Sequence, residues 1–289
     1  MERGGRKVSQ KLENVKALYI EKYILLTGGH TGIGLGVTKK LLKLENKIGL
    51  IIRNESRKKM LLSELNGFPQ ELIDNIDFFY ADLSDQAQIR AAAQEIRDKW
   101  PRVDRLFNNA AVLVPGRKKS KQGNEHHFEV NTLAPYLLTT ELKPLLLNSA
   151  DAIVITTVTD GMHRRKLRTD QIMNTDYKRG MMLYGQSKQG AMLLMNDLTK
   201  SWQGVKFLAV NPGQNKTKMT TNDAPGIIKY LARFFFNEPE VGSQRIYNAG
   251  FDELFTSENG VYITGDKVVA IKYELSAQDK EALLAGIYN

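Results

Sequence analysis

The stretch YILLTGGHTGIG, residues Tyr23–Gly34, decides the fold. Its first five residues have the apolar character of a short buried strand, and the glycine-rich turn TGGHTGIG (Thr27–Gly34) leads directly into a segment of helical length. The glycines let the backbone turn tightly and approach a phosphate, and the N-terminus of the following helix offers unpaired N–H groups and positive dipole. A strand, a glycine turn and a helix in this order predict a pyrophosphate-binding site.

Apolar runs alternate with amphipathic segments of helical length along the rest of the chain. The clearest helix is DQAQIRAAAQEIRDKW (Asp85–Trp100), which begins just after Ser84, a predicted N-cap. Strands that are apolar throughout and separated by helices indicate a parallel sheet buried on both faces. Including Tyr23–Thr27, seven strands are predicted, the others being Lys47–Ile52, Ile76–Tyr80, Arg105–Asn109, Ala152–Thr156, Lys206–Val210 and Val261–Thr264.

This pattern predicts the α/β class with a doubly wound parallel sheet, the Rossmann architecture. No internal repeat or Pro/Gly-rich linker interrupts the strand–helix rhythm. We therefore expect one dinucleotide-binding catalytic domain over residues 17–289, preceded by a flexible N-terminal arm over residues 1–16.

Composition narrows the functional classes. The chain has 289 residues, 42% of them hydrophobic, and no cysteine, so disulfides, thiolate metal sites and cysteine nucleophiles are excluded and no metal site is predicted. The polar start and the lack of a run approaching about 20 apolar residues predict a cytoplasmic protein without a membrane span. The net charge is +9, but its basic residues are scattered apart from GRKKSK (Gly116–Lys121) and HRRKLR (His163–Arg168). Solvated loops explain these runs, and we expect no nucleic-acid partner.

The end of the second predicted strand indicates which dinucleotide binds. Sheets that prefer NAD place an acidic residue there, which accepts hydrogen bonds from the ribose. Here the text is LIIRNES, with Arg53 and Asn54 at the tip and Arg57 just beyond. Because an arginine pairs well with a 2′-phosphate, the sequence predicts NADP(H) as the cofactor.

The segment YGQSK places Tyr184 and Lys188 four residues apart in a helical stretch, where they share a face. A phenol, with a pKa of about 10, exchanges protons usefully near neutral pH only when a nearby cation favours its phenolate. Lys188 can supply that charge. Alone, a tyrosine and a lysine at this spacing are weak evidence for a catalytic pair, because such pairs arise by chance on many helices. Downstream of the glycine turn, the evidence is stronger.

With these elements the chain resembles the short-chain dehydrogenase/reductase family from Thr27 to about Ile287. The resemblance rests on the T-G-x-x-x-G-[IL]-G spacing of Gly28, Gly32 and Gly34, on NNAAV (Asn108–Val112), on FEVNTLAPYLLT (Phe128–Thr139), on YGQSK and on NPGQNKTKM (Asn211–Met219). The tail GVYITGDKVV is similar to that of the retinol-dehydrogenase-like branch. Ala111 departs from the family, which has a glycine there.

The resemblance implies roles for individual residues. It implies that Tyr184, Lys188 and Asn131 are catalytic, with Asn131 positioning a water that relays protons to Lys188. It further implies that the cofactor is bound by Gly28, Thr31, Gly32, Ile33, Gly34, Arg53, Asn54, Asp82, Leu83, Asn109, Ala110, Tyr184, Lys188, Pro212, Gly213 and Thr217.

The tip of the fifth strand leaves one assignment open. The family has a serine there that polarises the substrate carbonyl, whereas this chain reads AIVITTVTD, residues 152–160. Aligning the threonine pair with the family's serine pair makes Thr157 the catalytic hydroxyl, and threonine has the same donor and acceptor capacity as serine. Other registers place Thr159 there, or Val158 and therefore no hydroxyl.

These features predict an NADPH-dependent oxidoreductase that transfers hydride between nicotinamide and a carbonyl or alcohol group of an apolar small molecule. The segment Met219–Phe236 is predicted to cover the substrate, either as a mobile lid or as an ordinary packed helix. The alternative is an NADP(H)-binding sensor or partner-binding protein with little turnover, motivated by the threonines and Ala111. Family members are often dimers or tetramers, so a homo-oligomer is compatible with the sequence, which shows no specific interface.

Overall fold

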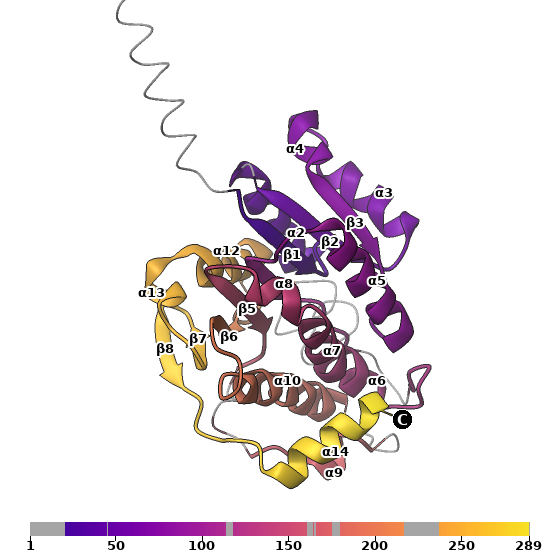
Figure 1. The fold of residues 1–289 in the computed structure, drawn as a ribbon, viewed down its shortest axis with the longest axis vertical. Coiled ribbons are helices and arrows are strands. Elements are labelled where there is room, and N and C mark those ends of the chain that lie inside the picture. Colours follow the sequence, from indigo (N-terminus) through magenta and orange to yellow (C-terminus); the bar gives the residue numbers. More distant parts are fainter. Residues whose placement is uncertain are drawn as a thin grey trace, which may run out of the picture.

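The chain forms a single α/β domain around one eight-stranded sheet (Figure 1). The computed structural model describes residues 21–44, 46–113, 118–160, 164, 166–174, 180–216 and 237–288. The predicted N-terminal arm, Thr217 and the segment Met219–Phe236 lie outside these described residues.

The strand order is β3-β2-β1-β4-β5-β6-β7-β8, and every neighbouring pair is parallel except β7 with β8. The chain therefore reverses its winding direction between β1 and β4, which is where such sheets bind ligands at the carboxyl ends of their strands. The strands are β1 (Tyr23–Thr27), β2 (Lys47–Ile52), β3 (Ile76–Tyr80), β4 (Arg105–Asn108), β5 (Ala152–Thr157), β6 (Val205–Asn211), β7 (Val261–Thr264) and β8 (Lys267–Ala270).

Helices cover both faces of the sheet, and each face has its own apolar core. One core joins the sheet to α2, α3 and α12 through Val37, Leu61 and Ile246. The other joins it to α5, α7 and α10, which follow one another along the opposite side in Figure 1. The helical elements are α2 (Gly32–Leu41), η1 (Leu42–Leu44), α3 (Glu55–Glu64), α4 (Gln70–Asp74), α5 (Gln86–Lys99), α6 (His126–Phe128), the π-helical turn η2 (Glu129–Leu133), α7 (Ala134–Glu141), α8 (Lys143–Leu147), α9 (Thr169–Ile172), α10 (Gly180–Leu198), α12 (Pro239–Phe251), α13 (Glu253–Thr256) and α14 (Ala277–Tyr288).

The predicted fold class is confirmed, with two local corrections. The sheet has eight strands rather than seven, because the chain turns at Gly265 (φ 60°) and returns as the short antiparallel strand β8. Helix α5 is capped by Asp85, whose carboxylate accepts from the Ala87 N–H, and not by Ser84. The Ser84 hydroxyl instead donates to Asp82 at 2.8 Å.

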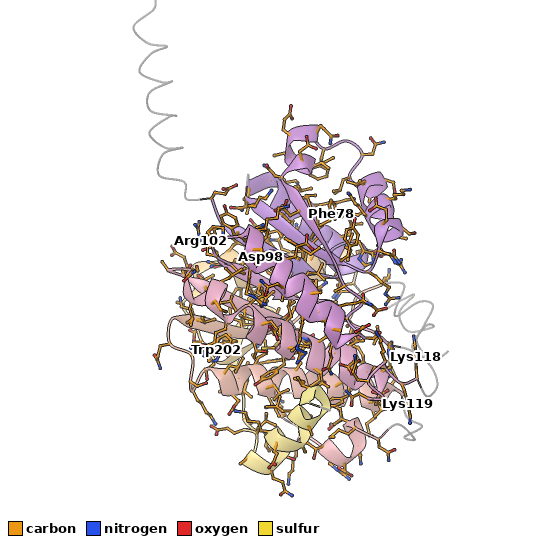
Figure 2. All side chains as sticks on the ribbon, turned by 45° about the vertical axis from the view of Figure 1, so that its right-hand side comes forward. Phe78, Asp98, Arg102, Lys118, Lys119 and Trp202 are labelled. Carbon is orange, nitrogen blue, oxygen red and sulfur yellow. The ribbon has the colours of Figure 1, made fainter. Side chains whose placement is uncertain are left out.

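The described part of the basic run before α6, residues 118–121, lies at or near the surface. Figure 2 shows Lys118 and Lys119 at the edge of the molecule, and both residues are exposed. Lys121 forms an ion pair with Asp85 at 2.8 Å while remaining 72% exposed. Among the described residues, no helix has the length and apolar character needed to cross a membrane.

Candidate active site

The carboxyl ends of the central strands enclose the main cleft, whose volume is about 180 Å³. It lies at the point where the winding direction reverses, and four strand ends, the first turn of α2 and α10 contribute to it. Its lining residues come from the glycine turn after β1, from the segments after β4, β5 and β6, and from α10; they are Gly28, His30, Thr31, Gly32, Ile33, Gly34, Asn109, Ala110, Ala111, Thr157, Val158, Tyr184, Lys188 and Pro212. The structure thus brings most of the predicted site residues to one cleft.

The glycine turn leaves room where a side chain would block it. Gly28 and Gly32 have positive φ angles of 70° and 55°, which favour glycine. A Cβ atom on Gly34 would lie 2.1 Å from the carbonyl oxygen of Gly28, so only glycine fits there. The turn is fastened to α2 by the Thr38 hydroxyl, which donates to the Gly29 carbonyl at 2.9 Å.

The first turn of α2 is suited to an anion. Its N-cap, Thr31, makes no side-chain capping bond, and the turn contains no acidic residue. The backbone N–H groups at this end therefore remain available, and the helix dipole favours negative charge there. Together with the close-packed glycines, this end of the cleft fits the pyrophosphate of a dinucleotide.

A second cavity, of about 100 Å³, lies beside the first at the ends of β2 and β3. Arg53, Asp82 and Leu83 line it as predicted, and the Arg53 Nε lies 3.2 Å from Asp82 Oδ2. Burial raises the pKa of Asp82, but hydrogen bonds from Ser84 and the charge of Arg53 outweigh it and leave this pKa below its usual value. The position of the second cavity beside the glycine turn is the one expected for the adenosine end of a dinucleotide.

His30 and Arg57 also line the second cavity, and neither is among the predicted site residues. The sequence shows Arg57 just beyond the end of β2. His30 occupies one of the variable positions inside the glycine turn, so only the turn itself pointed to it. Asn54, predicted to contact the cofactor, is not among the residues that line either cavity. Its side chain caps α3 by accepting from the Arg57 N–H at 3.2 Å.

Hydrogen bonds tie the tip of β4 to the tip of β1. The N–H groups of Asn109 and Ala110 each lie 3.0 Å from the Thr27 hydroxyl oxygen, and the Asn109 side-chain amide donates to the Thr27 carbonyl at 3.2 Å. This pairing brings Ala110 so close to Gly28 that a Cβ on Gly28 would lie 2.9 Å from the Ala110 Cα. Ala111, which replaces the family's glycine, lines the main cleft.

Tyr184 and Lys188 project from α10 into the main cleft. The Lys188 ammonium donates to the Thr157 carbonyl at 2.7 Å, which joins α10 to the end of β5. Burial raises the pKa of Tyr184 to about 12 and lowers the pKa of Lys188 to about 7, because water is excluded from both charged forms. From the sequence, we expect the Lys188 charge to lower the pKa of Tyr184. In the protein without cofactor, burial has the opposite effect and sets the pKa of both groups.

The threonines at the end of β5 differ in what they reach. Thr157 lines the main cleft, and its hydroxyl lies 3.4 Å from the Asn109 side-chain oxygen. Thr159 is not among the cleft-lining residues, and its carbonyl accepts from the Tyr262 hydroxyl at 3.4 Å. Val158 also lines the cleft but has no polar side chain. Among the three registers, Thr157 is the one that brings a side-chain hydroxyl to the cleft.

Asn131 lies in the π-helical turn η2 and is buried, with its side chain fully engaged by the protein. Its oxygen accepts from the Val112 N–H at 2.8 Å, and its amide donates to the Val112 carbonyl and to the Ser187 hydroxyl, each at 3.0 Å. The Ser187 hydroxyl in turn donates to the Tyr184 carbonyl at 2.8 Å. Asn131 therefore connects the segment after β4 to the helix that carries Tyr184.

The segment after β6 completes the cleft. Pro212 lines it, and Gly213 takes a positive φ of 82° while its N–H donates to the Asn211 side chain at 3.0 Å. Arg245 of α12 donates to the Pro212 carbonyl at 3.2 Å and thereby connects this turn to α12. Thr217, predicted to contact the cofactor, lies outside the described residues.

A doubly wound sheet with a glycine turn, a cleft at its reversal point and a tyrosine–lysine pair is typical of dinucleotide-dependent oxidoreductases. The family model described as short chain dehydrogenase matches residues 22–227. The chain therefore belongs to the short-chain dehydrogenase/reductase family, in its retinol-dehydrogenase-like branch.

Similar proteins agree with this assignment. Human dehydrogenase/reductase SDR family member 12 is 29% identical over 74% of this chain and 66% of its own length, so the matched part is just under two thirds of that relative. Mouse retinol dehydrogenase 11 is 25% identical over 88% of this chain and 80% of its own length. Human polyprenol dehydrogenase is 28% identical over 86% of this chain and 78% of its own length.

Solved structures show the same fold. A Burkholderia cenocepacia short chain dehydrogenase in complex with NADP superposes with a TM-score of 0.66, at 19% identity, over 84% of this chain and 95% of that one. The NADPH-bound carbonyl reductase from chicken fatty liver gives a TM-score of 0.63, at 20% identity, over 87% of this chain and 100% of that one.

Proposed function

We propose that this protein is an NADP(H)-dependent carbonyl reductase, or alcohol dehydrogenase in the reverse direction, for an apolar small molecule. The observation that carries the proposal is a single cleft in which the glycine turn, Thr157, Tyr184 and Lys188 meet. The apolar character assigned to the substrate follows from the cleft itself, whose exposed lining is mainly apolar.

The preference for NADP(H) rests on charge. Arg53 stands at the end of β2, where a carboxylate would select NAD, and it lines the second cavity with Arg57. Two guanidinium groups favour a 2′-phosphate, which carries almost two negative charges near neutral pH. The NADP complex and the NADPH-bound carbonyl reductase among the similar structures are consistent with this choice.

Each protein group has a distinct part in the proposed reaction. The bound nicotinamide supplies or accepts the hydride at the substrate carbon. The Thr157 hydroxyl holds the substrate oxygen, and Tyr184 gives that oxygen a proton in reduction or takes one in oxidation. Lys188 stabilises the phenolate that remains after the proton has left. Asn131 acts through its bonds to Val112 and Ser187, which hold the helix of Tyr184 in place.

The raised pKa of Tyr184 favours reduction near neutral pH. With a pKa of about 12, the phenol keeps its proton and is ready to donate it. Oxidation requires the phenolate, whose population increases with pH. We therefore expect carbonyl reduction to dominate near neutral pH and alcohol oxidation to improve as the pH rises.

The test measures NADPH oxidation against a panel of apolar aldehydes and ketones, with Tyr184→Phe as the decisive variant. We expect Tyr184→Phe to lower kcat by roughly 10²–10⁴-fold, the usual contribution of a positioned acid, while NADPH still binds. Tyr273→Phe, a change at an exposed tyrosine, serves as the matched control and should keep full turnover.

Two outcomes would contradict the proposal. Full turnover in Tyr184→Phe would remove the assigned proton donor. Tight NADPH binding by the unmodified protein with no turnover on the whole panel would favour the alternative, a cofactor-binding sensor.

A further inference from the structure

His30 stands at the boundary between the two cavities of the cofactor site. It lines both of them, together with Gly28 and Ala110, so its ring is next to the passage from the main cleft to the adenosine end. A dinucleotide that occupies both cavities must pass this side chain. Its position is fixed by the glycine turn, which Thr38 fastens to α2.

One ring nitrogen of the His30 imidazole lacks a hydrogen bond to any described residue. Its Nδ1 is buried and has no hydrogen-bond partner among the described residues. Buried polar atoms without partners are uncommon, and each one found in a native structure calls for an explanation. Because Nδ1 is buried, an anion in the adjoining cavity reaches it only if the ring turns toward that cavity.

Several charged groups surround His30. Arg53 at the end of β2 and Arg57 in α3 line the second cavity with it, as does Asp82, which follows β3 and is paired with Arg53 at 3.2 Å. Tyr184 and Lys188 share the main cleft with it. Burial, followed by the charges of Arg57 and Arg53, lowers the pKa of His30 to about 4. The ring is therefore neutral near neutral pH.

We propose that His30 is a specificity-determining residue that takes up a proton when the 2′-phosphate of NADP(H) enters the cavity lined by His30, Arg53 and Arg57. This proposal rests on the proposed NADP(H)-dependent function. The proton comes from solvent and goes to the imidazole, and no covalent bond of the ligand changes. The phosphate dianion provides the negative charge that makes an imidazolium beside two guanidinium groups favourable.

The sign of the pH dependence follows from this exchange. Without the phosphate, repulsion and burial keep His30 neutral. With the phosphate, its pKa rises, so the complex binds more protons than the free protein over the interval between the two pKa values. NADPH affinity therefore increases as the pH falls through that interval, and NADH affinity does not, because NADH has no 2′-phosphate.

Calorimetry measures this proton directly. NADPH is titrated into the protein near pH 7.5 in buffers of different ionisation enthalpy, which gives the number of protons taken up. At that pH a phosphate monoester, with a second pKa of about 6, is already almost fully ionised and contributes little. We expect uptake of a substantially larger fraction of one proton with NADPH than with NADH, because any proton that Lys188 takes up is common to both cofactors.

The variants His30→Asn and His30→Gln keep a polar side chain but cannot take up the proton. We expect both to abolish the excess uptake with NADPH and to weaken NADPH binding about tenfold with little change for NADH, since tenfold corresponds to about 1.4 kcal/mol, within the range of a charged hydrogen bond. Arg57→Gln removes a neighbouring positive charge and should raise the pKa of His30 in the free protein, which NMR of the four histidines measures.

The outcomes separate this proposal from the proposed function. Proton uptake that is the same in the unmodified protein and in both His30 variants, or the same for NADPH and NADH, overturns the role of His30 and leaves the reductase assignment standing. Failure of the unmodified protein to bind NADPH overturns both. If one His30 variant does not fold, the other variant and the histidine resonances still decide the matter.

Discussion

The two ends of the cofactor cleft are built on different physical principles. At the adenosine end, the turn after β1 relies on backbone shape, and the charged groups are partly exposed; Arg53 has a side-chain exposure of 52%. At the catalytic end, Thr157 and Lys188 are only 7% and 2% exposed, and burial shifts the pKa values of Tyr184 and Lys188 strongly. The first end gains affinity from fitted geometry, and the second gains reactivity by holding ionisable groups away from water.

The comparison implies that the buried Lys188 at the catalytic end lowers the stability of the protein. An unpaired buried ammonium opposes folding, because the charge prefers water. The hydrogen bond from Lys188 to the Thr157 carbonyl offsets this only in part, since the pKa of Lys188 remains at about 7. Residues that lower stability in return for activity are typical of active sites.

Lys188→Met tests this statement most strongly. We expect kcat to fall by about 10³-fold, within the range for a group that supports acid–base catalysis, while the free energy of unfolding near pH 7 increases by about 1–4 kcal/mol. The measurements are steady-state kinetics and urea unfolding. A folded variant that loses both activity and stability would show that Lys188 is mainly structural.

The pH dependence of stability gives a second measurement on the same variant. The pKa of Lys188 is 10.5 in the unfolded chain and about 7 in the folded protein, so the unfolded chain binds more protons between these values. Stability of the unmodified protein should therefore gain a contribution as the pH rises through this window, and Lys188→Met should lack it. Lys200→Met, at a half-exposed lysine, is the control and should change stability by less than about 0.5 kcal/mol.

The hydroxyl at the end of β5 gives the next largest effect. We expect Thr157→Val to lower kcat about 10²-fold, the lower limit for losing one donor to the reacting oxygen, and Thr157→Ser to keep or increase activity. Thr159→Val should leave kcat within about twofold, because Thr159 does not line the cleft. Loss of activity in Thr159→Val but not in Thr157→Val would show that Thr159, and not Thr157, provides the catalytic hydroxyl.

The sequence predicted the fold better than the chemistry of the site. The strands were located because each is a short apolar run between helices, and β1, β2, β3 and β7 agree with the predicted bounds residue for residue. Strand β8 was missed because Lys267–Ala270 is short, and its ends are exposed to solvent. No buried apolar run marks it.

The properties that could not be predicted depend on groups that meet only in the folded chain. His30 sits at a variable position of the glycine turn, and its low pKa reflects first its burial and then the charges of Arg57 in α3 and Arg53 after β2. Likewise, the fixed geometry of Asn131 comes from Val112 and Ser187, 19 and 56 residues away in sequence. Motif spacing places such residues at the site but does not give their partners or their protonation.

The adenosine end is tested by a pair of glycines that share one backbone conformation. Gly28 has φ +70° and Gly204 has φ +84°, so alanine at either position adopts a left-handed conformation that costs roughly 1–2 kcal/mol. They differ in their surroundings. A Cβ on Gly28 would lie 2.9 Å from the Ala110 Cα, whereas a Cβ on Gly204 meets no atom of the described residues within 4 Å beyond its chain neighbours.

We therefore expect Gly28→Ala to lose more stability than Gly204→Ala, because its Cβ also clashes with Ala110, and only Gly28→Ala to weaken NADPH binding, by about tenfold. The reason is that the tips of β1 and β4 must separate to admit the methyl group, which disturbs the turn facing the pyrophosphate. Fluorescence titration with NADPH, alongside thermal unfolding of both variants, measures the two effects separately. Equal NADPH affinity in both variants would mean that the close contact between these tips does not shape the site. Backbone geometry would then not explain binding at the adenosine end.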